Sequence, residues 1–201
     1  MDPGRACVDA RGMWMLYMFA FDNVGVVVGD LYFVDPEPHK GQEGAEHGVR
    51  LELRTVEQGQ LVDSIYAAYP IAVDRPVWRA DFLESVDGTP GSFDRTHHHP
   101  VFTGWDPGKR VFVRELSADP LGWLADRLAD LDGLLRAGGF PADTAGPNDA
   151  AELRRAAPEI VDATRRLLER VRTGELGNRP EGAAAAPAEG RPQALVRSGW
   201  L

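Results

Sequence analysis

Hydrophobic positions in the first part of the chain form short runs and alternations that predict β-strands. Two apolar runs, at 13–21 and 24–34, are rich in Val, Phe, Tyr and Met, and the turn residues Asp22-Asn23 separate them. This combination is typical of a β-hairpin. At 49–56 apolar and polar residues alternate, which predicts a strand with one face in the core and one face in water.

The same reasoning predicts further strands at 61–73, 77–86, 101–105 and 110–116. Pro70 bends or interrupts the first of these, because proline cannot donate a hydrogen bond to a neighbouring strand. In 77–86 the apolar residues alternate, so Asp81 is expected on the opposite, water-facing side. The last two segments are expected to form a hairpin through the turn at 106–109.

From residue 117 the hydrophobic period lengthens from two to between three and four, which predicts helices. One apolar stripe ends before Gly138-Gly139 and consists of Leu121, Leu124, Leu128, Leu131 and Leu135. A second helix is expected to begin after Asn148-Asp149 and to be interrupted by Pro158. After Gly174 the composition is dominated by Gly, Ala, Pro and Glu, which predicts disorder.

Strands followed by helices, rather than alternating with them, indicate an α+β fold. We expect a mostly antiparallel β-sandwich or half-open barrel of about six or seven strands, followed by a helical hairpin that packs on one face or end. The expected division is a flexible N-terminus (1–12), a β-rich domain (13–116), a helical segment packed on it (117–173) and a disordered tail (174–201).

The net charge of −9 restricts the classes of partner. An acidic surface repels phosphate backbones and anionic lipids, so neither nucleic acid nor a membrane surface is an expected partner. The apolar run at 13–21 is far shorter than the roughly 20 residues that cross a bilayer. The single cysteine, Cys7, cannot form an intrachain disulfide. These features favour a cytoplasmic protein.

Common catalytic signatures are absent from the sequence. It contains no glycine-rich dinucleotide or P-loop motif, no paired cysteines and no serine in a nucleophile elbow. Its most distinctive chemical feature is the run His97-His98-His99, followed by Pro100. In an extended segment His97 and His99 point the same way, roughly 6–7 Å apart along the strand, while His98 faces away.

Two imidazoles at this spacing can bind one metal ion, and imidazole suits Zn, Fe, Cu or Ni. A third ligand must then come from elsewhere. The loop at 35–48 holds four candidates: His39, Glu43, Glu46 and His47. If the sheet brings this loop close to His97 and His99, the result is a site of two or three histidines, with or without a carboxylate, that keeps one open position, as a catalytic metal requires.

Two other interpretations of the sequence remain open. The histidines can be structural or solvent-facing, with Asp94 and Arg95 near enough in sequence to satisfy them. The protein can also be a non-catalytic binding or assembly subunit that contacts a partner protein or a second copy of itself. Its helices, or the C-terminal peptide with Trp200 and Leu201, would then form the contact, since aromatic anchors dominate such interfaces.

Overall fold

The computed structural model describes residues 14–38, 40–59 and 71–180. The predicted flexible segment at 1–12 and residues 61–70 of the strand predicted at 61–73 lie outside these residues, as does the predicted disorder from 181 onward. Residues 174–180 are described, and Leu176 is fully buried. The amide of Gly177 donates to Asp30 Oδ2 at 3.0 Å, so the first residues of the predicted tail pack against strand β2 (Val24–Val34).

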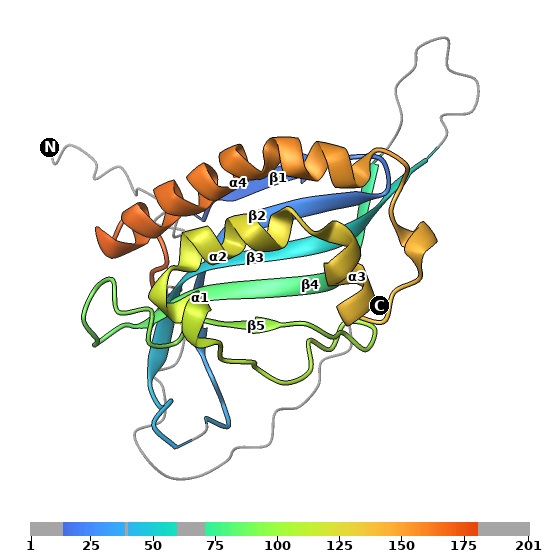
Figure 1. Ribbon diagram of the computed structural model, residues 1–201. Coiled ribbons are helices and arrows are strands. Elements are labelled where there is room, and N and C mark those ends of the chain that lie inside the picture. Colours follow the sequence, from blue (N-terminus) through green and yellow to red (C-terminus); the bar gives the residue numbers. More distant parts are fainter. Residues whose placement is uncertain (1–13, 39, 60–70, 181–201) are drawn as a thin grey trace, which may run out of the picture.

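Five antiparallel strands form one sheet in the order β1-β2-β3-β4-β5, so each strand pairs with its sequence neighbour (Figure 1). Besides β2, the strands are β1 (Leu16–Ala20), β3 (Ala45–Gln58), β4 (Ile71–Ser85) and β5 (His97–His99). The predicted α+β fold is confirmed, and helices follow the strands. The sheet does not close into a barrel. The described residues contain no second sheet, so the predicted β-sandwich is not formed. Helices make up the layer that packs on the sheet.

The helices cover one face of this sheet (Figure 1). They are α1 (Arg114–Ala118), α2 (Pro120–Leu128), α3 (Leu131–Ala137), the short 3-10 helix η1 (Ala142–Thr144) and α4 (Asp149–Arg172). The predicted first helix is divided into α2 and α3, because Asp130 caps a new helix by accepting from the amide of Gly133 at 3.0 Å. Its leucine stripe nevertheless stays in the core.

The core lies between the helices and the facing side of the sheet. Val26, Leu53 and Trp78 form one register row across β2, β3 and β4, and all three are buried. Leu124 of α2 and Ile160 of α4 pack against this face and are fully buried. Because side chains alternate between the two faces of a sheet, the polar side chains of these strands lie on the opposite face, which we call the open face.

Pro158 does not interrupt α4, contrary to the prediction from sequence. Proline removes one backbone hydrogen bond and clashes with the preceding turn, at a cost of about 3 kcal/mol. Leu153 and Ile160 are fully buried on either side of it. The packing of a 24-residue helix on the sheet therefore outweighs the local defect. None of the described helices combines the length and the apolar character needed to cross a bilayer.

The segment 100–113 is a loop, not the predicted hairpin of two strands. Only single bridges occur there, one between Thr103 and Asp106 and another between His98 and Val111. The second bridge is formed by two backbone hydrogen bonds of 3.0 and 2.9 Å. The last predicted strand instead ends in α1. The turn at 106–109 is present, and Asp106 Oδ1 accepts from the amide of Gly108 at 2.8 Å.

Candidate metal centre

The pairing of β4 with β5 brings three polar side chains together on the open face. Asp81 pairs with His97, Ala80 with His98, and Arg79 with His99. Because side chains alternate along a strand, His97 and His99 lie on the same face as Asp81, and His98 lies on the helix side. The sequence pattern predicts that His97 and His99 lie on the same face, and the structure confirms it.

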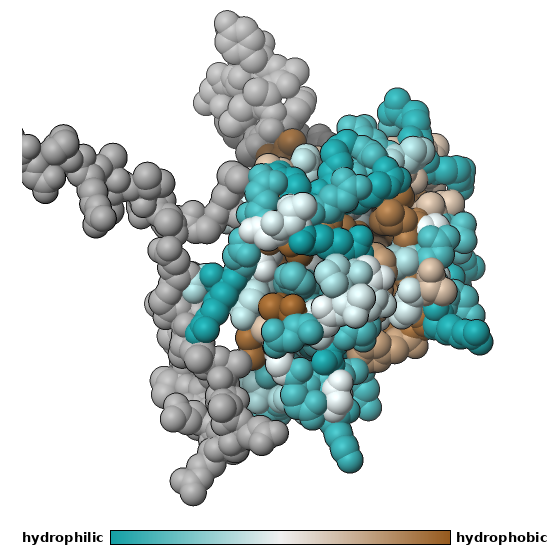
Figure 2. Space-filling view, turned by 90° about the vertical axis from the view of Figure 1, so that its left-hand side faces the viewer, coloured by the Kyte–Doolittle hydropathy of each residue, from teal (hydrophilic) through white to brown (hydrophobic). Residues whose placement is uncertain are grey.

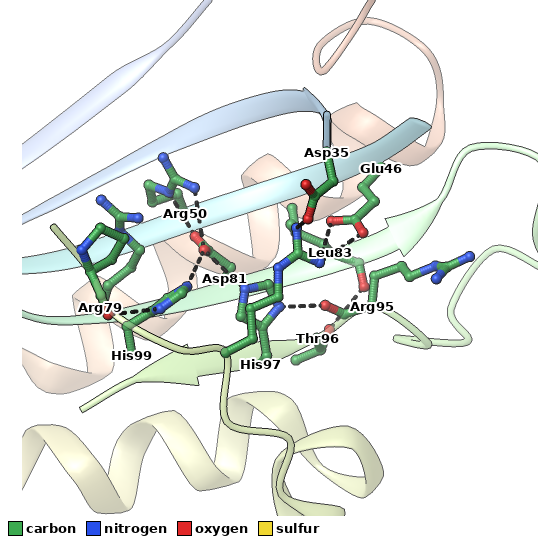
Figure 3. A network of polar contacts seen from close by, with 12 residues as sticks. Asp35, Glu46, Arg50, Arg79, Asp81, Leu83, Arg95, Thr96, His97 and His99 are labelled. Atoms are coloured by element: carbon green, nitrogen blue, oxygen red, sulfur yellow. Dashed lines mark hydrogen bonds and ion pairs between the residues drawn. The ribbon is translucent and has the colours of Figure 1, made fainter. Parts of the chain in front are cut away.

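These three side chains are buried, with exposed fractions of 1% for Asp81, 1% for His97 and 5% for His99. Nε2 of His97 lies 3.4 Å from Asp81 Oδ2, and Nε2 of His99 lies 3.5 Å from the same oxygen. One ligand atom from each residue lies within 4.8 Å of those of the other two (Figure 3). Within the described ranges, no other group of three metal-ligating side chains is this close together.

Backbone carbonyls hold both imidazole rings in one orientation. Nδ1 of His97 lies 2.7 Å from the carbonyl oxygen of Arg95, and Nδ1 of His99 lies 3.0 Å from that of Pro107. A carbonyl oxygen can only accept, so each Nδ1 carries a proton and donates. In the neutral ring the lone pair is then on Nε2, and both lone pairs point at the carboxylate of Asp81. Metal-binding histidines are oriented by outer hydrogen bonds of this kind.

Asp81 is itself fixed by Arg50 from the neighbouring strand β3. Nε of Arg50 donates to Oδ1 at 2.7 Å, and its Nη2 donates to Oδ2 at 3.2 Å. Burial raises the pKa of Asp81, but the contacts with His97, His99 and Arg50 outweigh it and hold the pKa well below its ordinary value. The carboxylate is therefore ionised, and the Nε2 atoms of His97 and His99 converge on an anion.

Such a cluster is stable only with a positive charge at its centre, either a proton on Nε2 or a metal ion. A charge-assisted N–H···O bond runs about 2.7–2.9 Å, which is shorter than the two separations here. Ligand atoms bound to one metal at ~2.1 Å with tetrahedral angles lie about 3.4 Å apart. The two histidine-to-aspartate separations, 3.4 and 3.5 Å, match this second value.

A cavity of about 600 Å³ opens directly on the three candidate ligands. One wall is the open face of the sheet, and the other is the loop 107–112, which folds over that face. Phe112 lies against His97, with 5.4 Å between the ring centroids. The ligands are thus shielded from bulk water but remain accessible to a small molecule.

The loop is held in place by Arg110. Its Nη1 donates to both carboxylate oxygens of Glu46, at 2.9 and 3.2 Å, and its Nη2 lies 3.3 Å from Asp35 Oδ2. The guanidinium also lies over the ring of Phe33, 5.4 Å from its centroid. This set of contacts joins the loop to the ends of β2 and β3.

The other ligand candidates from the 35–48 loop are not brought to His97 and His99. Glu46 is buried as the partner of Arg110. His47 pairs with Glu84 on the helix side, where burial lowers its pKa, with opposing effects from Glu84 and Arg172. Glu43 is exposed and accepts from the amide of Gly41 at 2.8 Å. His39 lies outside the described residues.

Asp81 is the site residue that the sequence reasoning missed. The alternation of Trp78, Ala80 and Phe82 placed it correctly on the face away from the core. The error was to assume that this face is wet there, whereas the loop 100–113 and strand β5 cover it. The pairing of β5 with β4 places Asp81 opposite His97, so knowledge of that pairing would have identified Asp81 as a site residue.

His98 packs against aromatic side chains and is not part of the candidate site. It lies on the helix side between Trp78 and Trp123, with ring centroids 6.4 and 5.2 Å away. Burial, together with nearby Arg127 and the two neighbouring histidines, lowers its pKa to about 4. Its side chain is therefore a neutral packing group that does not reach the metal centre.

Comparison of the chain with protein-family models, with curated proteins and with solved structures found no match.

Proposed function

We propose that this protein binds one divalent transition-metal ion through Asp81, His97 and His99, and that it is a metal-dependent enzyme acting on a small molecule. The observation that carries the proposal is the convergence of two Nε2 lone pairs on one carboxylate oxygen. Both rings are held in this orientation by donation from Nδ1 to a backbone carbonyl. Zinc is the first ion to test, because it takes nitrogen and oxygen ligands and the two histidine-to-aspartate separations agree with tetrahedral coordination.

The number of ligands favours a catalytic rather than a structural ion. Structural zinc sites use four protein ligands, whereas catalytic sites use three and leave one position for water or substrate. Here the open position would face the cavity of about 600 Å³. A metal in this position lowers the pKa of a bound water to about 7 and polarises a bound carbonyl or phosphoryl oxygen.

Elemental analysis and zinc titration of untagged, chelator-free protein test the proposal. We expect about one equivalent of zinc per chain in the parent and at least about 100-fold weaker binding in His97→Ala/His99→Ala, which removes two of the three ligands. His98→Leu is the matched control, because it changes the intervening residue on the other face of β5 and should keep the metal. Circular dichroism establishes that each variant is folded.

Two outcomes would contradict the proposal. The first is a folded parent protein that takes up no zinc, iron(II), cobalt or nickel. The second is a folded double variant that binds zinc as tightly as the parent does. In either case the histidines would be structural, as protonated partners of Asp81.

A second candidate function, partner binding, is favoured by one observation. On β1 and just before it, Trp14, Leu16 and Met18 are 68%, 51% and 40% exposed. Within the described residues the helices expose no large hydrophobic side chain, and α4 presents ion pairs such as Arg165–Asp162. Figure 2 shows hydrophilic residues with some hydrophobic ones among them on the end of the molecule that it faces. The C-terminal peptide lies outside the described residues. A metal-free parent protein would make β1 the first surface to test for a protein partner or a second copy.

The remaining parts of the proposal concern location and partners. We propose a cytoplasmic protein, because its one cysteine offers no intrachain disulfide. We also propose that it does not bind nucleic acid or membrane surfaces, because a net charge of −9 repels both.

A further inference from the structure

The cavity beside the metal centre is rich in positive charge, although the chain as a whole is acidic. Four cationic side chains line it, and they are Arg50, Arg79, Lys109 and Arg110. Two carboxylates line it, Asp35 and Asp81. With Glu46, Glu52 and Arg54, which form ion pairs with these side chains or with each other, there are five cations and four carboxylates, so the cavity region carries one positive charge in excess in a chain of net charge −9.

The carboxylate that holds Arg79 does not neutralise this excess. Glu52 accepts from Arg79 Nε at 2.8 Å and from Arg54 Nη1 at 2.7 Å, so one negative charge is shared by two guanidinium groups. Guanidinium groups stay charged in proteins. Arg79 is also the register partner of His99, which places its positive charge directly beside the metal centre.

Lys109 supplies a second, mobile charge at the entrance. It lies in the turn of the loop that forms the outer wall, and it is exposed. Within the described part of the chain its ammonium group has no ion-pair partner, unlike the three arginines of the lining. A lysine of this kind is a point charge on a flexible stem and can close over a bound anion.

We propose that the cavity binds a small oxyanion, a carboxylate or phosphate compound, with its anionic group between Arg79 and Lys109. Its reacting group faces the open position of the metal, and this second part rests on the proposed function. The volume of about 600 Å³ is within the usual range for small-molecule sites. A small anion is favoured over a polyanion, because the net charge of −9 repels a large anion that would contact the protein beyond the cavity.

Isothermal titration calorimetry with succinate, inorganic phosphate and neutral succinamide tests the inference. The proteins are zinc-treated and freed of excess zinc, and the salt concentration is constant. At least one of the two anions is expected to bind, and succinamide is not. Lys109→Met should weaken anion binding about 5- to 10-fold, because it removes one charge at the anion. Lys40→Met is the matched control, since Lys40 is the other lysine of the chain, is exposed and does not line the cavity.

The outcomes separate this inference from the proposed function. Zinc-bound protein that binds neither anion, or binds succinamide equally well, overturns the inference and leaves the metal site standing. Equal anion binding by the parent and Lys109→Met also overturns it. Anion binding that depends on Lys109 in protein that takes up no zinc supports the basic cavity and refutes the metal proposal. A preference for succinate or for phosphate identifies the source of the oxyanion.

Discussion

Replacing Asp81 with asparagine is expected to weaken zinc binding at least about 100-fold. The amide is a poor metal ligand because it carries no charge. It can nevertheless replace the carboxylate in the metal-free state, since its oxygen can still accept from Arg50 while its NH₂ group donates to an imidazole Nε2. The substitution also removes the ion pair with Arg50 and turns an NH₂ donor toward one of its two N–H groups, so a moderate loss of stability is expected as well.

This expectation distinguishes the metal centre from a structural ion pair. If the histidines were protonated partners of Asp81, its neutralisation would leave buried charges without a counter-charge and cost about 3–5 kcal/mol. Zinc affinity is measured by competition with a chelator, and stability by urea unfolding in EDTA. Asp87→Asn is the control, since Asp87 is exposed and its replacement changes the net charge by the same amount. Zinc binding by Asp81→Asn as tight as that of the parent would contradict the metal assignment.

Replacing Asp149 with alanine is expected to lower the free energy of unfolding by about 3 kcal/mol. Asp149 is fully buried at the first turn of α4. Its Oδ1 accepts from the amide of Asp22 at 2.7 Å, and its Oδ2 accepts from those of Asn23 and Gly146 at 3.1 and 2.7 Å. One carboxylate therefore joins the β1–β2 turn to the start of α4, and alanine leaves all three donors without this acceptor.

Thermal unfolding should show this loss as a fall in Tm of about 6–12 °C for a chain of this length. Asp143→Ala is the control, because Asp143 is an exposed aspartate in η1, just before α4. The variant Asp149→Asn should retain part of the stability, since an amide oxygen accepts hydrogen bonds without the charge. A Tm for Asp149→Ala within about 2 °C of the parent would show that water replaces the carboxylate.

Local patterns predicted most of the fold because they depend on neighbours in sequence. The alternation at 49–56 and the turn at Asp22-Asn23 are confirmed by β3 and by the β1–β2 hairpin. The outcome at Pro158 was not predictable, because it depends on how strongly the rest of α4 packs on the sheet. The loop at 100–113 likewise follows from tertiary contacts, notably those of Arg110 with Glu46 and Asp35.

The candidate site was predictable only in part, for the same reason. The spacing of His97 and His99 shows that they share a face, which requires only that the segment is extended. The third candidate ligand depends on which strand lies beside β5, and no pattern within 77–86 reveals that pairing. The backbone acceptors at Arg95 and Pro107 have no side-chain signature in the sequence at all.

The hydrogen bond from His99 to the Pro107 carbonyl links the metal centre to the outer wall of the cavity. Displacement of the 106–109 turn would remove the acceptor that orients His99, so opening of the wall would weaken the proposed metal binding. By thermodynamic reciprocity, a ligand that keeps the turn closed raises the metal affinity by the same factor by which the metal raises the ligand affinity. If the proposed metal and anion both bind, a single backbone oxygen would make the two binding events cooperative.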